Sequence, residues 1–250
     1  DSVLHTLDTV DPIRDLGVIE GEFVLLDLIA VENRLARLEE ERKKGKADAR
    51  QQNALETALM ERLRAQLEAE QPLRGLDLTP DELKLVRGYG FLTLKPVLVI
   101  FNTGNGDADP ARGLVREQQH TRALTLQGKL EAEIAQLDDP EDVALFLAEY
   151  QIERPSRERV LQLSYDLLGI HSFFTYGEDE VRAWPLRKGG TVLEAAGTIH
   201  TDLARGFIRA EVVAYEDFVA AGGSMAEVKA RGKMRLEGRD YVVRDGDMIL

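Results

Sequence analysis

The side chains best placed for chemistry follow a run of apolar residues. Pro96–Phe101 is a continuous apolar segment of strand length, and the turn-forming stretch Asn102–Asp107 follows it directly. In doubly wound sheets, ligands bind beyond the carboxyl ends of the strands. The amide of Asn102 offers both a donor and an acceptor, which is what the edge of a purine requires. Asn102 therefore suits a base-binding role, although an Asn at this point can also cap its own turn.

Motifs for phosphate binding and catalysis are incomplete. Gly-Lys pairs occur at 45–46, 128–129 and 232–233, but none has the upstream Gly and following hydroxyl of a Gly-x-x-x-x-Gly-Lys-Ser/Thr loop. His200-Thr-Asp202 has no accompanying nucleophile, so we interpret its hydroxyl and carboxylate as turn caps. The sequence motifs show no complete active site, and they leave open whether the chain is an enzyme.

Five cations in the last eighty residues are candidates for a surface that contacts RNA. They are Lys188, Arg205, Arg209, Lys233 and Arg235. Residues 1–170 hold 21 Lys and Arg against 32 Asp and Glu, whereas residues 171–250 hold 11 against 13. Because acidic surface repels phosphate backbones, we expect RNA contact only in the C-terminal part, and we expect no DNA binding. The alternative interpretation is a scattered, solvated set of charges.

Composition excludes several classes of protein. No cysteine is present, which excludes disulfides and thiolate metal sites and favours a reducing, cytoplasmic compartment. No apolar stretch approaches the ~20 residues of a membrane span, and the N-terminal residues do not form a signal peptide. The sequence starts at Asp1, without an initiator Met, and we therefore expect a partial chain.

Two helices with leucine stripes are predicted ahead of the apolar strand. Pro12 suits the first turn of the first helix, and a charged stretch, 39–50, separates it from the second. The apolar positions are Ile19, Phe23, Leu26, Leu28, Val31, Leu35 and Leu38, and then Leu55, Leu59, Leu63 and Leu67. Their spacing predicts an antiparallel helical hairpin or short coiled coil over 19–72. A capping box is predicted at Thr79–Glu82.

Beyond residue 96 the alternation of strand, loop and helix predicts an α/β architecture. The predicted strands are 96–101, buried on both faces as in a parallel sheet, and 123–126; the predicted helices are 112–120, 128–137, 140–150 and 156–169. From about residue 171 the pattern predicts a small α+β unit, with Trp184 in its core. Its predicted strands are 172–176, 180–186, 207–215 and 239–243, and its predicted helices are 192–198 and 216–221.

Several blocks, in order, resemble the YchF (Obg-like ATPase) family. The blocks at 173–177, 195–202, 205–212 and 240–247 resemble its TGS domain, and those at 10–15 and 89–96 resemble its upstream part. The resemblance covers nearly the whole chain. It implies a partial P-loop nucleotide domain over 1–18 and 73–170, a coiled-coil insert over 19–72, and a ubiquitin-like β-grasp TGS domain over 171–250.

The same resemblance implies ATP, or less readily GTP, as substrate, with Mg²⁺, and association with ribosomes and their RNA. It assigns base binding to Asn102, Thr103, Asn105, Gln127 and Gly128. The family's Asn-x-x-Glu motif reads Asn102-Thr-Gly-Asn105 here, so the amide is kept and the charge-assisted bond of the carboxylate is lost. Leu126-Gln-Gly128 matches the second base loop imperfectly.

The phosphate loop, switch regions and Mg²⁺ ligands of the family precede the segment that matches Val10–Asp15, and its last strand residues follow Leu250. Phosphoryl transfer depends on those parts for positioning and charge stabilisation. We therefore expect these 250 residues alone to be inactive. Two alternatives stay open: a non-enzymatic RNA or ribosome adaptor that acts through the TGS domain, and a degenerate remnant.

Overall fold

The computed structural model describes residue 7 and residues 9–44, 47–104, 120–177 and 180–250. The chain divides into two compact units, residues 1–160 and 161–250, and each is described by itself. Within the described ranges, no helix is long and apolar enough to cross a membrane.

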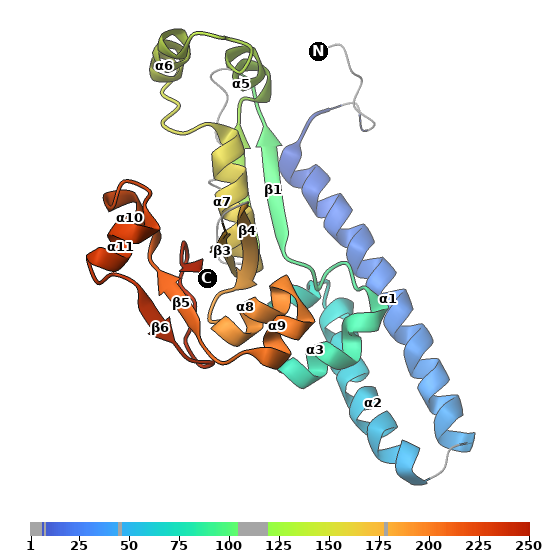
Figure 1. The fold of residues 1–250 in the computed structure, drawn as a ribbon. Helices are drawn as coiled ribbons and strands as arrows, with labels where there is room; N and C mark the ends of the chain where they lie inside the picture. Colours follow the sequence, from blue (N-terminus) through green and yellow to red (C-terminus); the bar gives the residue numbers. More distant parts are fainter. Residues whose placement is uncertain (1–6, 8, 45–46, 105–119, 178–179) are drawn as a thin grey trace. The chain divides into compact units, whose positions relative to one another are not determined.

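A long helical hairpin dominates the N-terminal unit. Helices α1 (Pro12–Lys44) and α2 (Ala47–Glu68) lie side by side in opposite directions (Figure 1). Their core holds Val24, Val31 and Leu38 from α1 and Leu59, Met60, Leu63 and Leu67 from α2. Spacings of seven residues return to nearly the same helix face, so Val24, Val31 and Leu38 point together towards α2.

Four residues of the predicted stripe lie outside this core, the half-buried Phe23 and three exposed residues, which corrects the prediction. Ile19, Leu26 and Leu55 are 51%, 53% and 64% exposed. Leu26 lies two residues from Val24, about 200° around the helix, and therefore faces away from α2.

A short irregular segment leads from the hairpin to the first strand. It contains two 3₁₀ turns, η1 (Leu73–Gly75) and η2 (Arg87–Tyr89), and helix α3 (Pro80–Val86). Thr79 and Glu82 form the predicted capping box at the start of α3. Leu73, Val86 and Phe91 are buried against the hairpin core, so this segment packs as part of the hairpin.

Two parallel strands follow in the same unit. β1 (Val97–Asn102) pairs with β2 (Thr121–Leu126), from Val97 opposite Thr121 to Asn102 opposite Leu126. Helices α5 (Gly128–Ile134), α6 (Pro140–Glu149) and α7 (Ser156–Leu168) come next, as predicted. Burial of β1 on both faces was predicted and is not found, since Ile100 is 44% exposed while Phe101 is buried. The predicted helix at 112–120 falls, apart from its last residue, outside the described residues.

The C-terminal unit is a five-stranded mixed sheet with helices on both faces. Its strands are β3 (Ile170–Tyr176), β4 (Val181–Arg187), β5 (Ala210–Val213), β6 (Arg235–Glu237) and β7 (Met248–Ile249), in the order β4-β3-β7-β5-β6. β3 and β7 are parallel, and the other pairs are antiparallel.

Successive side chains of a strand point to opposite faces. Val212 and Ile249 pack with helix α8 (Val192–Ile199), which is followed by α9 (Thr201–Gly206). Their neighbours Val213 and Met248 join a second cluster with residues of α10 (Tyr215–Ala220) and α11 (Met225–Ala230).

Two strand predictions in this unit were wrong in extent or place. The strand predicted over 207–215 is limited to β5, because Tyr215 already begins α10. No strand forms over 239–243, where only Val242 makes an isolated bridge, to Thr191. The Tyr241 carbonyl instead accepts from the Val192 amide at the start of α8. The strand that forms near this segment is β6, which ends before residue 239. Helix α11 was not predicted from the sequence.

Candidate functional site

The ends of the two parallel strands hold the loops to which base binding was assigned. The Gly128 amide donates to Oδ1 of Asn102 at 2.9 Å. The Thr103 amide donates to the Leu126 carbonyl at 2.9 Å, and the Thr103 hydroxyl donates to the same carbonyl at 3.3 Å. The fold thus brings together Asn102, Thr103, Gln127 and Gly128, while Asn105 lies outside the described residues.

Among the described residues, the Asn102 oxygen accepts from a loop 26 residues further along the chain. This bond holds the two loops together, and the second lone pair of Oδ1 and the amide nitrogen remain available for other hydrogen bonds. Gly128 has no room for a side chain here. A Cβ at this position would lie 2.9 Å from Asn102 Oδ1.

Gln127 supplies an acceptor without a partner. Its Oε1 is buried and has no hydrogen-bond partner among the described residues. A buried acceptor of this kind is uncommon in folded proteins. Within the described ranges no group of three or more His, Asp or Glu is placed to hold a metal ion.

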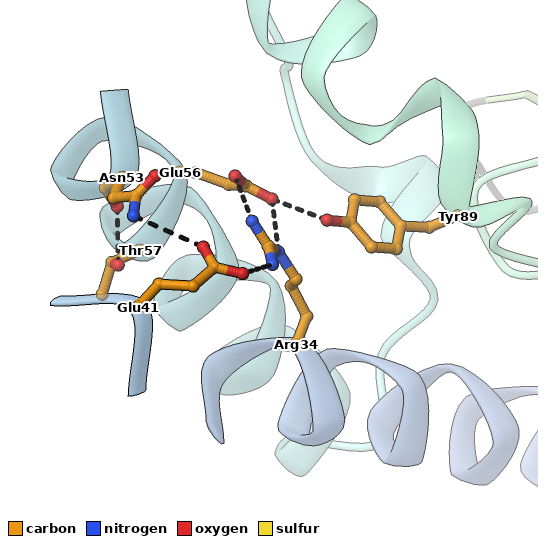
Figure 2. Close-up of polar contacts among 6 residues, drawn as sticks. All are labelled: Arg34, Glu41, Asn53, Glu56, Thr57 and Tyr89. Carbon is orange, nitrogen blue, oxygen red and sulfur yellow. Dashed lines mark hydrogen bonds and ion pairs between the residues drawn. The ribbon is translucent and has the colours of Figure 1, made fainter. Parts of the chain in front are cut away.

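A polar cluster fastens the hairpin to the segment that leads into β1 (Figure 2). Arg34 donates to both carboxylate oxygens of Glu56, at 2.8 and 2.9 Å, and to Glu41 at 2.9 Å. The Tyr89 hydroxyl donates to Glu56 at 2.6 Å. The hydrogen bond from Arg34 holds the pKa of Glu56 below its usual range. Burial, and then the bond to Glu56, raise the pKa of Tyr89 to about 12.

A buried arginine makes a second connection of this kind. Arg74 is 3% exposed; it forms an ion pair with Glu20 of α1 and donates to the Thr121 hydroxyl at the start of β2 at 3.1 Å. The base-site strands are therefore anchored to the hairpin through side chains that the sequence patterns did not single out. The only sequence signal for the role of Arg74 is its position as a single charged residue in an apolar stretch.

The five cations of the C-terminal unit do not gather in one patch. Lys188 follows β4, at one edge of the sheet, whereas Lys233 and Arg235 lie next to or on β6, at the other edge. Four of the five form ion pairs with acidic groups: Lys188 with Asp166, Arg205 with Asp202, Lys233 with Asp217, and Arg235 with Asp247 and Glu237. Their positive charge is thereby largely compensated.

Arg209 has different surroundings. It lines a cavity of about 710 Å³ in the C-terminal unit together with Arg182 and Trp184, and no ion pair to it is seen within the described residues. The Arg182 guanidinium lies 4.3 Å over the Trp184 ring, and the indole N–H donates to Thr175 at 3.0 Å. Arg182 was missed from the sequence; its spacing of two from Trp184 on a strand was the available signal.

Comparisons with known proteins agree over the whole chain. The family model YchF-GTPase_C, described as a protein of unknown function (DUF933), matches residues 170–250. A ribosome-binding ATPase YchF of Bacillus subtilis is 40% identical over 257 residues, which cover 100% of this chain and 69% of that protein. The corresponding protein of Pasteurella multocida is 39% identical, and the match covers 68% of it.

A solved structure gives the same result. The structure of the Schizosaccharomyces pombe YchF GTPase matches with a TM-score of 0.83 and 26% identity, covering 100% of this chain and 68% of that one. The similarity thus extends over both compact units and includes the hairpin.

Proposed function

Since this chain belongs to the YchF family, we propose that it carries the base-binding half of a ribosome-associated nucleotide hydrolase, together with the units that contact the ribosome. The observation that carries the proposal is the bond from Gly128 to Asn102, which unites two loops at the carboxyl ends of parallel strands. Ligands of open α/β sheets bind at this edge.

The nucleotide would be ATP, or less readily GTP. Asn102, Thr103 and Gln127 offer neutral donors and acceptors for a purine, and the motif has an Asn at position 105 instead of a carboxylate. The 250 residues contain no Gly-x-x-x-x-Gly-Lys-Ser/Thr, so they lack the amides and the lysine that cradle a triphosphate. We therefore propose that the chain by itself does not hydrolyse ATP.

The experiment is an ATPase assay of the purified 250-residue chain with Mg²⁺. We expect phosphate release to equal that of the Asn102→Ala variant and of the buffer. Turnover by the chain that is lost in Asn102→Ala would overturn the proposal, because it would show that the phosphate-binding parts are not required.

Ribosome contact is proposed for the C-terminal unit, in the cytoplasm. Its strand order, with two parallel central strands flanked by antiparallel ones, supports a β-grasp fold of the TGS type. Arg209 and Arg182 are the cations we assign to ribosomal RNA, with smaller contributions from Lys188, Arg205, Lys233 and Arg235. Co-sedimentation with ribosomes at increasing salt concentration tests this assignment. Each phosphate contact that a substitution removes makes the binding constant less dependent on salt concentration.

We expect Arg209→Ala to weaken co-sedimentation more than Lys233→Ala, its matched control, since Lys233 is already paired with Asp217 at 3.2 Å. Equal effects of the two variants would contradict the assignment.

The second candidate is an adaptor without nucleotide chemistry. It is favoured by the C-terminal unit, which has two apolar clusters of its own and does not depend on the base site for its core. Ribosome binding unchanged by Asn102→Ala and by added ATP would favour the adaptor. Binding that responds to ATP would favour the nucleotide hydrolase.

A further inference from the structure

Helix α5 is held at its first residue and at its middle, and the two contacts join the candidate base site to helix α7. At its first residue, the Gly128 amide donates to Asn102 at 2.9 Å. One turn later, Glu131 accepts from the Ser156 amide at 2.5 Å with one carboxylate oxygen and from the Ser156 hydroxyl with the other. Ser156 is 8% exposed, so this contact is shielded from water.

Glu131 acts as an N-terminal cap that α7 does not have in its own sequence. The first amides of a helix lack partners within the helix and carry partial positive charge, which a carboxylate stabilises. The residue before Ser156 is Pro155, whose side chain offers no acceptor for capping. The start of α7 therefore depends on a carboxylate supplied by α5.

Helix α7 also connects the two units of the chain. The boundary between them falls between residues 160 and 161, inside this helix. Gly169, with a φ of 62°, then joins α7 to β3 at Ile170.

We propose that α5 couples the base site to α7. Formation of the Asn102–Gly128 hydrogen bond stabilises the Glu131–Ser156 cap. A nucleobase bound at these loops therefore controls whether the first turn of α7 is formed. The identity of this ligand, a purine nucleotide, rests on the proposed function. Leu130 and Ile134 bury one side of α5, and Glu131 lies three residues after Gly128 on this helix of seven residues. A displacement at Gly128 would therefore reach Glu131 along one helical turn.

The test is a double-mutant cycle read by amide hydrogen exchange at Ser156 and Arg157, in the 250-residue chain without nucleotide. Glu131→Ala should speed exchange there at least about tenfold, and Asn102→Ala at least about threefold. The double variant should show less than the product of the two effects. Glu133→Ala, on an exposed position of the same helix, is the matched control and should change nothing.

Two further measurements distinguish a local effect at α7 from unfolding of either unit. Amides of Leu63 and Val212 report opening of each unit's core, and they must stay unchanged for a local effect to be claimed. If Glu131→Ala fails to fold, Ser156→Ala removes the hydroxyl bond alone. The inference is overturned if Asn102→Ala speeds exchange at Gly128 and leaves Ser156 unaffected. Because no nucleotide is present, this result is independent of the ATPase and ribosome experiments.

Discussion

Asp27 of α1 and Thr93, 66 residues later, are joined by two hydrogen bonds to one carboxylate oxygen. Oδ2 of Asp27 accepts from the Thr93 amide at 2.7 Å and from its hydroxyl at 2.6 Å, while Oδ1 accepts from the Leu92 amide at 2.8 Å. Asp27 is 3% exposed and Thr93 is 1% exposed. The segment before β1 is thereby held against the hairpin by the buried Asp27 carboxylate, and both of its oxygens accept hydrogen bonds.

Asp27→Ala should destabilise the N-terminal unit by about 2–4 kcal/mol, because the Leu92 and Thr93 amides and the Thr93 hydroxyl proton would lose their acceptor. Urea unfolding followed by helical circular dichroism measures this change. Asp77→Asn, at an exposed position, is the control and should have almost no effect. A loss under about 0.5 kcal/mol for Asp27→Ala would show that water replaces the carboxylate.

The Arg34–Glu56–Tyr89 cluster should make the hairpin sensitive to alkaline pH. The folded pKa of Tyr89, about 12, lies above the ordinary value of 10.0. The stability linked to Tyr89 is therefore fully present below pH 10.0 and is lost as the pH rises through about 12. Thermal unfolding between those pH values should show a steeper decline for the parent chain than for Tyr89→Phe. Tyr150→Phe, at an exposed position of the same unit, should behave like the parent.

Glu56 has the opposite dependence on pH. Its folded pKa is lowered, first by the hydrogen bond from Arg34, so its contribution is present above the unfolded pKa and is lost as the pH falls through the folded one. Glu56→Gln should flatten the decline of stability of the N-terminal unit in acid, as measured by urea midpoints from pH 7 down to about 3. An unchanged slope would exclude Glu56 as the titrating group.

Gly128→Ala should break the contact between the base-site loops. Its Cβ would meet Asn102 Oδ1 at 2.9 Å, so the amide would have to rotate and its bond would be lost, at a cost of about 1–2 kcal/mol. Because both changes remove the same bond, adding Asn102→Ala should then cost little more. Denaturant unfolding of the single and double variants measures this, and fully additive costs would contradict the geometry.

Gly17→Ala and Gly21→Ala should stabilise helix α1. Both glycines lie within the helix, and a Cβ at either position meets nothing within 4 Å. Alanine loses less backbone entropy on forming a helix, which is worth about 0.5–1 kcal/mol per site. A rise in melting temperature without a change of fold is the expected result. A fall would show that another surface packs against this face of α1.

The positions of most helices and strands, and the start of α3, could be predicted from the sequence, because those features depend on neighbours within a few residues. The capping box of Thr79 and Glu82 spans three positions, and the leucine periodicity places the hairpin helices without reference to any distant residue. The same local signals placed the loops after β1 and β2.

Which side chains face one another could not be predicted from the sequence and is seen only in the folded chain. Nothing in the sequence around Asn102 shows that its oxygen bonds Gly128, nor that Asp27 accepts from Thr93, because such pairs form between segments that meet only after packing. The same holds for Arg74 in the core and for the lysines paired with Asp166 and Asp217.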